Sequence, residues 1–302
     1  SSYKNMKPTL SVSKPTCCFI KMSFVIEESF VKGKSLTSLC EDGWVATPDY
    51  VVVIDGATSK SDYRIDGVTT GRKAMEIISD EVQRLPSGIS ASEFVNIINE
   101  RIIRYYKTNH ILDLVERFPE TRLTASVAVY CHSRNEVWLI GDCQCKVGEC
   151  CFKNNKKIDS ILSELRSFVL CSALRDGSSI KELQKRDIGR EFIYPMLKRQ
   201  YLWQNNLDDN SEYRYIVLDG FPVDYALIRI IPVGDRSVVL ATDGYFDLYG
   251  TLQETEQALC LQIETDPLCI GIGCDKNNKS TKGVLPGNCS FDDRTYVRVS
   301  CF

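Results

Sequence analysis

Acidic residues stand next to several of the segments that this sequence predicts as β-strands. Glu41 precedes the apolar run YVVVI, Asp55 follows it directly, Asp142 and Asp243 each follow a later strand, and Asp292 precedes the last one. A carboxylate at the end of a buried strand is costly to leave without a partner. These positions therefore indicate a nearby cation or basic side chains, and a fold that brings strand ends together.

The hydrophobic pattern places strands and helices in groups rather than in strict alternation. Strands are expected at 22–31, 50–54, 123–131, 136–140, 213–218, 225–231, 237–242 and 296–301. Helices are expected at 74–85, 91–107, 158–169 and around 252–263, with a less regular helical stretch at 179–204 that Pro195 interrupts. Asp219-Gly220 is expected to be a turn. The grouping predicts an α+β architecture with helices packed over antiparallel sheets.

The histidine and cysteine content limits the metal that such a site would hold. Hard cations such as Mg²⁺ and Mn²⁺ prefer oxygen ligands, and the chain has only two histidines, which we expect at the surface. The 14 cysteines include adjacent pairs at 17–18 and 150–151, near Cys143-x-Cys145, but without the spacing of a zinc site. We expect most of them to be reduced thiols in the core.

Charge and hydropathy exclude some classes of partner. A net charge of -3 and a pI near 5.6 give no reason to expect nucleic acid or an anionic membrane. No apolar stretch approaches the roughly 18 to 20 residues that span a bilayer. We expect a cytoplasmic monomer with a loose leader at 1–20 and one domain over 21–302, with a variable insertion at about 145–212.

Five short motifs resemble, in their order, those of the metal-dependent protein serine/threonine phosphatases (type 2C, or PPM), especially the bacterial members. They are CED at 40–42, VIDGA at 53–57, LIGDC at 139–143, LATDGYFD at 240–247 and DDRT at 292–295. The motifs span residues 41 to 295, and the region 145–212 matches poorly. The resemblance implies a four-layer αββα sandwich of two antiparallel β-sheets flanked by helices.

The same resemblance implies two divalent cations, Mn²⁺ or Mg²⁺, in a cleft at one end of the sandwich. Asp55 would bridge both ions, Asp243 and Asp292 would hold the first, and Glu41 would act through water on the second, together with the Gly56 carbonyl. Asp55, Asp243 and Asp292 are thus the expected catalytic residues.

A weaker third metal is also implied by the resemblance, with Asp142 as its ligand. Asp42, Asp247 and Asp293 would support the ligands. The implied activity is hydrolysis of phosphoserine and phosphothreonine in phosphorylated proteins by a water molecule that two metals activate.

Three positions depart from the family pattern. Thr37 stands where many relatives carry a phosphate-binding arginine, for which Lys34 is a candidate substitute, and Ala57 stands where many eukaryotic members have a histidine. Cys143 replaces the usual serine. Two alternatives therefore stay open: a catalytically impaired phosphatase-like regulatory or binding protein, and a hydrolase of a small phosphoester.

Overall fold

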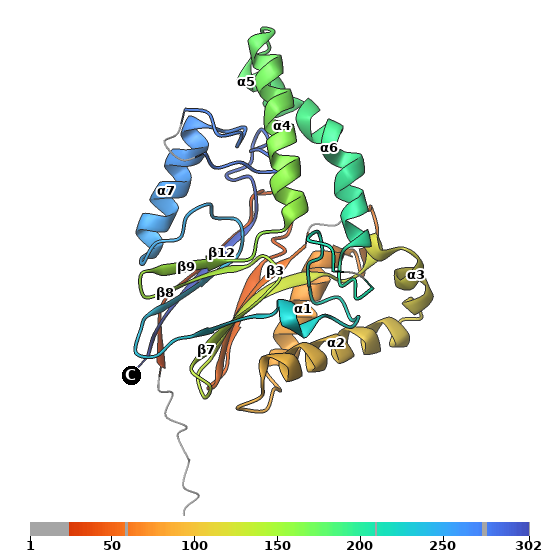
Figure 1. Cartoon of the computed structure of the whole chain (residues 1–302), viewed down its shortest axis with the longest axis vertical. Helices are drawn as coiled ribbons and strands as arrows, with labels where there is room; N and C mark the ends of the chain where they lie inside the picture. The colour runs from red at the N-terminus through yellow and green to blue at the C-terminus, as the bar shows by residue number, and fades with distance from the viewer. Residues whose placement is uncertain (1–23, 58–59, 209, 274–276, 302) are drawn as a thin grey trace, which may run out of the picture.

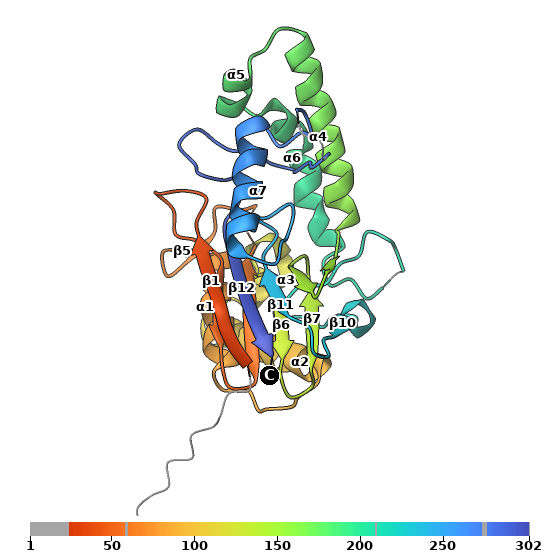
Figure 2. The ribbon, with the colours of Figure 1, turned by 90° about the vertical axis from the view of Figure 1, so that its left-hand side faces the viewer.

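Two antiparallel five-stranded sheets stack face to face in the computed structural model, which describes residues 24–57, 60–208, 210–273 and 277–301 (Figure 1). The order is β10-β7-β6-β3-β2 in one sheet and β1-β12-β11-β8-β9 in the other. Figure 2 shows β1, β12 and β11 side by side. The expected α+β fold of two antiparallel sheets flanked by helices is confirmed. The leader expected at 1–20, with its cysteine pair, lies outside the described residues.

The strands are β1 (Phe24–Lys32), β2 (Gly43–Ala46), β3 (Tyr50–Gly56), β4 (Arg64–Ile65), β5 (Val68–Thr69), β6 (Ala125–Cys131), β7 (Glu136–Ile140), β8 (Gln144–Val147), β9 (Cys150–Lys153), β10 (Arg229–Pro232), β11 (Val238–Ala241) and β12 (Arg294–Cys301). The α-helices are α1 (Thr70–Val82), α2 (Ala91–Thr108), α3 (Leu112–Arg117), α4 (Lys157–Arg175), α5 (Ile180–Lys185), α6 (Ile188–Arg199) and α7 (Leu252–Thr265). Short 3-10 helices are η1 (Pro119–Thr121), η2 (Gln200–Leu202) and η3 (Tyr225–Leu227).

Strand β3 is covered on both faces, which explains why its sequence is a continuous apolar run. Val51 and Val53 pack between the two sheets, while Val52 and Ile54 pack against α1 and α2 on the other face. Successive side chains of a strand point to opposite faces, so a strand covered on both sides needs apolar residues at every position. Helix α7 covers the outer face of the second sheet, where Leu259 joins the side chains of β11 and β12.

Helices α4, α5 and α6 form an extension that projects from the sandwich (Figure 1). They have small apolar clusters of their own, around Leu170 and around Leu162. Arg166 of α4 is fully buried and donates to Asp187 Oδ2 from Nε at 2.9 Å and from Nη2 at 2.7 Å. It also donates to the carbonyls of Leu268 at 2.8 Å and Ser280 at 2.9 Å. A single side chain thus joins α4, the start of α6 and the loop before β12.

Asp49 joins three turns: its own turn between β2 and β3, the turn between α1 and α2, and the turn between β6 and β7. Its carboxylate accepts hydrogen bonds from the Ser87 hydroxyl at 2.7 Å, the Gly88 amide at 2.8 Å, and both the amide and hydroxyl of Ser133 at 2.7 and 2.8 Å. Burial alone would raise the pKa of Asp49, but these donors outweigh it and hold the pKa below its usual range.

None of the described helices combines the length and apolarity that crossing a membrane requires.

Four expectations about elements were wrong. Pro195 lies inside α6 instead of interrupting it, on an exposed face where water can satisfy the freed carbonyl. Residues 213–218 form only isolated bridges, because the Asn205 side chain bonds both backbone groups of Val217 as a neighbouring strand would. Residues 225–227 form η3, so the strand there begins at Arg229. Residues 144–153, which we expected mainly within the insertion, form β8 and β9 of the second sheet.

Candidate metal centre

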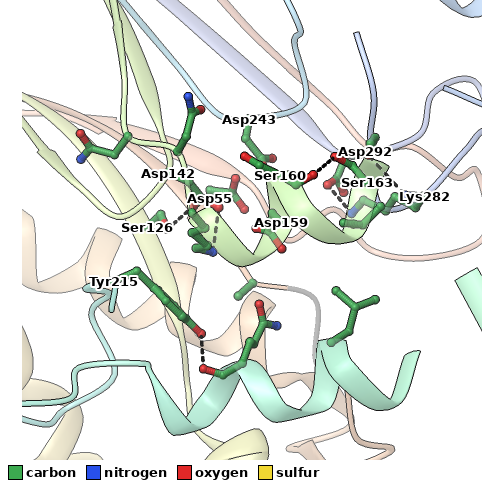
Figure 3. A pocket seen from close by; sticks show the side chains of 18 of the residues that line it. Asp55, Ser126, Asp142, Asp159, Ser160, Ser163, Tyr215, Asp243, Lys282 and Asp292 are labelled. Atoms are coloured by element: carbon green, nitrogen blue, oxygen red, sulfur yellow. Dashed lines mark hydrogen bonds and ion pairs between the residues drawn. The ribbon is translucent and has the colours of Figure 1, made fainter. Parts of the chain in front are cut away.

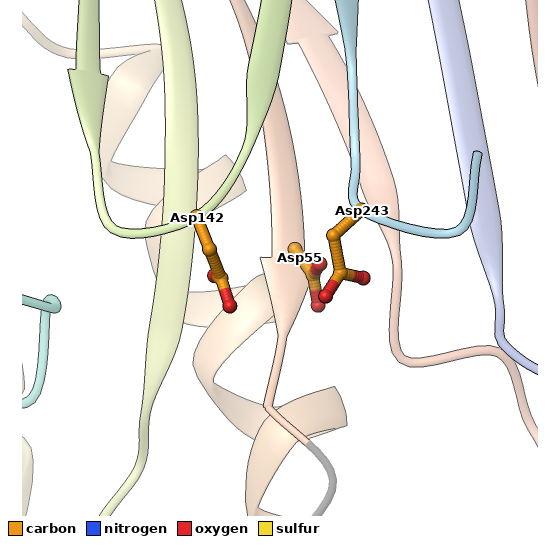
Figure 4. A group of neighbouring side chains, drawn as sticks. All are labelled: Asp55, Asp142 and Asp243. Atoms are coloured by element: carbon orange, nitrogen blue, oxygen red, sulfur yellow. The ribbon is translucent and has the colours of Figure 1, made fainter. Parts of the chain in front are cut away.

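Three aspartates converge from three strand ends (Figure 4). Asp55 is the second-to-last residue of β3, Asp142 lies between β7 and β8, and Asp243 follows β11. One carboxylate oxygen of each lies within 4.8 Å of the others. Strands β3 and β7 belong to one sheet and β11 to the other, so the two sheets bring these residues together at one end of the sandwich.

The electrostatics of this group indicate that a cation would stabilise it. Burial raises the pKa of Asp55 well above its usual range, and the nearby carboxylates of Asp243 and Asp42 raise it further. Burial followed by repulsion from Asp142 and Asp292 raises the pKa of Asp243 to about 6. Carboxylates so close together resist ionising at the same time, and a divalent cation removes that resistance.

Asp142 differs because it has two direct partners. The Ser126 hydroxyl donates to its Oδ1 at 2.6 Å, and Lys156 Nζ lies 2.7 Å from its Oδ2. Burial acts to raise the pKa of Asp142, but Lys156 and then Ser126 hold it below its usual range. The carboxylate is therefore charged and fixed in orientation, as a ligand needs to be.

Asp292 lies in the same cavity, but outside the group of three. Its Oδ1 is 3.0 Å from Lys34 Nζ, and its Oδ2 forms an ion pair with Lys282. Burial acts to raise its pKa, but Lys282 and Lys34 hold the pKa well below its usual range. The structure thus groups Asp142 with Asp55 and Asp243, whereas the sequence resemblance implied Asp292 as their partner.

Beside the aspartates, the backbone at Gly56 packs closely against the backbone at Glu41 and at Gly71. The Glu41 amide donates to Asp293 Oδ2 at 2.8 Å. A Cβ atom at Gly56 would lie 2.4 Å from the Gly71 carbonyl oxygen and 2.5 Å from that of Glu41. Only glycine permits this approach of β3 to the start of α1.

Asp42 supplies an independent sign that the site suits a cation. Its side chain is buried, and its Oδ2 has no hydrogen-bond partner among the described residues. Burial raises the pKa of Asp42, the Thr242 hydroxyl partly opposes this, and Asp292, Asp293 and Asp243 raise it further. Oxygen donors of this kind match Mg²⁺ and Mn²⁺ rather than softer metals.

Two of the remaining expected site residues, Asp293 and Asp247, accept hydrogen bonds from loop residues. Asp293 Oδ1 accepts the Lys34 amide at 2.9 Å, so with its bond to Glu41 it fixes both ends of the segment between β1 and β2. Asp247 accepts from Asn278 at 3.3 Å. Thr37 is exposed, and its hydroxyl lies 3.0 Å from that of Ser35, so it does not take the place of the expected arginine.

A cavity of about 240 Å³ opens over the aspartates (Figure 3). Its walls come from the segments that begin α4 and end α6 and from the loop before β12, and Tyr215 lines it as well. Five aspartates (55, 142, 159, 243 and 292) and five lysines (60, 153, 156, 279 and 282) line it. Sequence reasoning missed all five lysines, although the KNNKK run at 153–157 was a visible signal for two of them.

Soft ligands do not contribute to the centre. The group that could hold a metal in the described part of the chain contains neither histidine nor cysteine. Cys143 is buried beside the site, and its burial, together with Asp55, raises the pKa of its thiol well above the usual range. The expectation that most cysteines lie in the core was wrong: of the 11 described cysteines, only Cys131, Cys143, Cys145 and Cys269 are buried.

No family model and no curated protein sequence matches this chain. Several solved structures are similar to it. The serine/threonine phosphatase Stp1 from Staphylococcus aureus is 14% identical, with a TM-score of 0.45 over 92% of this chain and 96% of that one. The catalytic domain of the serine/threonine protein phosphatase PstP with two manganese ions is 13% identical, with a TM-score of 0.44 over 92% and 98%. RsbX in complex with magnesium is 11% identical, with a TM-score of 0.43 over 92% and 100%.

Proposed function

We propose that this chain is a metal-dependent phosphatase that hydrolyses phosphoserine and phosphothreonine in proteins. The observation that supports it most is the convergence of Asp55, Asp142 and Asp243 at the base of a lysine-lined cavity. The order of the five sequence motifs supports it as well. Carboxylates hold hard cations, and ammonium groups around them suit an anionic substrate.

The three clustered aspartates would hold divalent cations, and Asp292, Glu41 and the Gly56 carbonyl are the further ligands that the motifs imply. Bound Mn²⁺ or Mg²⁺ would lower the pKa of a coordinated water towards neutrality and offset charge on a phosphoryl oxygen. The Ser126 hydroxyl would hold Asp142 in place for that role, and a cation would displace Lys156 from Asp142 Oδ2. The lysines of the cavity wall would bind phosphate oxygens by charge-assisted hydrogen bonds.

One observation favours a second candidate, a phosphatase-like binding protein without turnover. Lys34 and Lys282 both pair with Asp292, so this carboxylate is already neutralised without a metal. The exposed position of Thr37 and the presence of Ala57 in the cavity wall agree with a site that lacks two of the family's polar groups.

Turnover of p-nitrophenyl phosphate and of a phosphothreonine peptide separates the two candidates. The assay is run with Mn²⁺, Mg²⁺ or EDTA on the wild type, on Asp243→Asn and on Asp235→Asn, an exposed aspartate near the start of β11 that serves as the matched control. The phosphatase proposal expects metal-dependent turnover that Asp243→Asn abolishes and Asp235→Asn keeps. Wild-type protein without turnover under every metal condition, but with metal binding in a calorimetric titration, would establish the binding protein instead.

A further inference from the structure

Cationic side chains gather on the wall of the cavity that the extension builds. Lys60 comes from the segment after β3 and Lys282 from the loop before β12, and both line the cavity. Arg190 of α6 lies beside that loop, since its Nη1 donates to the Thr281 carbonyl at 2.6 Å. We call Lys60, Arg190 and Lys282 the cation wall.

The members of the cation wall are close enough to repel one another. Burial lowers the pKa of Lys60 to about 8, and the next causes are the charges of Lys282 and Arg190. Asp159 opposes them, and Lys156 adds to them. Like charges crowded in a partly buried place destabilise the charged forms, and an anion bound between them relieves that cost.

Lys60 lies apart from the three clustered aspartates, whereas Lys282 joins the cation wall to the metal centre through its ion pair with Asp292. The charges that act most on Lys60 are those of Lys282, Arg190, Asp159 and Lys156, and none of the three clustered aspartates is among them. Lys60 lies next to α6, because the Tyr194 hydroxyl donates to its carbonyl at 3.3 Å, and Arg190 approaches from α6 behind the cavity lining, at Thr281 of the loop before β12. A substrate group bound there would lie beside the phosphate that reacts.

Charge balance gives the same result, on the premise that the proposed function is correct. The five aspartates and five lysines of the lining cancel. Two divalent cations would add four positive charges, and they would compete with Lys156 and Lys282 for the carboxylates these lysines now contact. Glu41, Asp42 and Asp293 beside the cavity offset part of that added charge. A lysine that the cations release from Asp142 or Asp292 is then available to a second anion of the substrate.

We propose that the cation wall binds a second anionic group of the substrate, so that the preferred substrates are phosphopeptides with an acidic side chain or a second phosphate next to the phosphorylated residue. This inference deepens the proposed function by naming the class of phosphopeptide. Ammonium and guanidinium groups bind carboxylate and phosphate by the same charge-assisted hydrogen bonds, so both sources of the anion fit.

Binding of labelled, non-hydrolysable phosphonate analogues of a phosphothreonine peptide tests this. Three peptides carry glutamates, glutamines or a non-hydrolysable phosphonate analogue of phosphoserine beside the first phosphonate, and the third is called the phosphoserine peptide. Their affinities are measured by fluorescence anisotropy in Mn²⁺ and in EDTA. Wild-type protein should bind the glutamate and phosphoserine peptides about tenfold more tightly than the glutamine peptide in Mn²⁺, which is the effect of one charge-assisted contact. The preference should shrink in high salt.

Variants of the cation wall provide the decisive comparison. Lys60→Met and Arg190→Met should each remove most of the preference, whereas Lys181→Met, on the exposed face of α5, should keep it. Thermal melts show which variants fold, and one folded variant, Lys60→Met or Arg190→Met, is sufficient for the test. Equal wild-type affinity for all three peptides, or an unchanged preference in a folded Lys60→Met or Arg190→Met protein, overturns the proposal.

The same experiment keeps this inference distinct from the proposed function. A protein without phosphatase turnover that still prefers the anionic peptides through Lys60 and Arg190 supports the cation wall while the enzyme proposal fails. A protein with metal-dependent turnover that does not distinguish the peptides is a phosphatase without this specificity. A preference for the phosphoserine peptide alone identifies a second phosphate as the anion.

Discussion

Replacing Arg166 should open the helical extension while the sandwich stays folded. The Arg166→Met substitution keeps much of the side-chain volume, but it leaves Asp187 Oδ2 and the carbonyls of Leu268 and Ser280 without their buried donor. Removing one partner of a buried ion pair costs roughly 3–5 kcal/mol. The extension should therefore open roughly 150 to 5,000 times more often.

Hydrogen exchange resolved along the chain measures this opening directly. We expect faster exchange in α4, α6 and residues 268–272, which share the small apolar clusters of the extension, and unchanged exchange in β3 and β6. Arg186→Met is the control, because the one ion pair of Arg186 with a described residue is at the surface, with exposed Glu191, and it should change nothing measurable. Unchanged exchange in α4, or an equal increase in β3 and β6, would refute the assignment of this role to Arg166.

Three further predictions concern the sandwich and the metal centre. Asp49→Asn should lower the free energy of unfolding by about 1–2 kcal/mol at pH 7, because the carboxylate accepts four hydrogen bonds. The pKa of Asp49 is lowered in the folded protein, so its stabilisation is complete above the unfolded pKa of roughly 3.9 and is lost as the pH falls through the folded value. Urea curves of the wild type and Asp49→Asn should thus converge in strong acid, and a constant difference would contradict this. Gly56→Ala should destabilise the protein by about 1–3 kcal/mol and weaken Mn²⁺ binding in calorimetry, because its Cβ would meet backbone oxygens at 2.4 and 2.5 Å. Gly250→Ala, with nothing within 4 Å, should do neither, and equal effects of the two would count against the packing argument. Mn²⁺ at about 100 times its Kd should stabilise the wild type by about 2.7 kcal/mol, seen as a higher Tm in scanning calorimetry. Asp243→Asn should lose that increase, and a variant that keeps it would exclude Asp243 as a ligand.

Local patterns were sufficient for the elements that have two well-covered faces or a regular apolar stripe. The continuous run in β3 and the helical spacing in α1 and α2 each predicted an element that the structure contains. The acidic residues at strand ends also indicated that strand ends meet, and the structure brings Asp55, Asp142 and Asp243 together although β6 lies between β3 and β7. For β3, α1 and α2 the signal lies within each element itself, whereas the aspartates gave a signal only as a set.

Features that depend on distant segments could not be read from the sequence. Lys60 and Lys282 come from opposite halves of the chain, and only the folded structure brings them to one cavity. Asp219 was expected only to mark a turn, yet it is fully buried. Its carboxylate accepts hydrogen bonds from Arg122 at 3.1 Å, Gln204 at 2.9 Å and Asn205 at 2.8 Å. A dipeptide does not reveal which side chains will surround it.

The strand order has a consequence for how the protein is made. Strand β12 lies between β1 and β11, and Phe24 at the start of β1 pairs with Cys301 in β12. Ribosomes add roughly 5–20 residues per second, so β1 waits roughly 15 to 50 seconds after its synthesis for its neighbour to emerge. During that interval the alternating apolar residues of β1 and the open edge of β11 are available to other nascent chains or to chaperones. Asp292 and Asp293 arrive with β12, so a nascent chain that has not yet exposed β12 lacks part of the set of acidic residues.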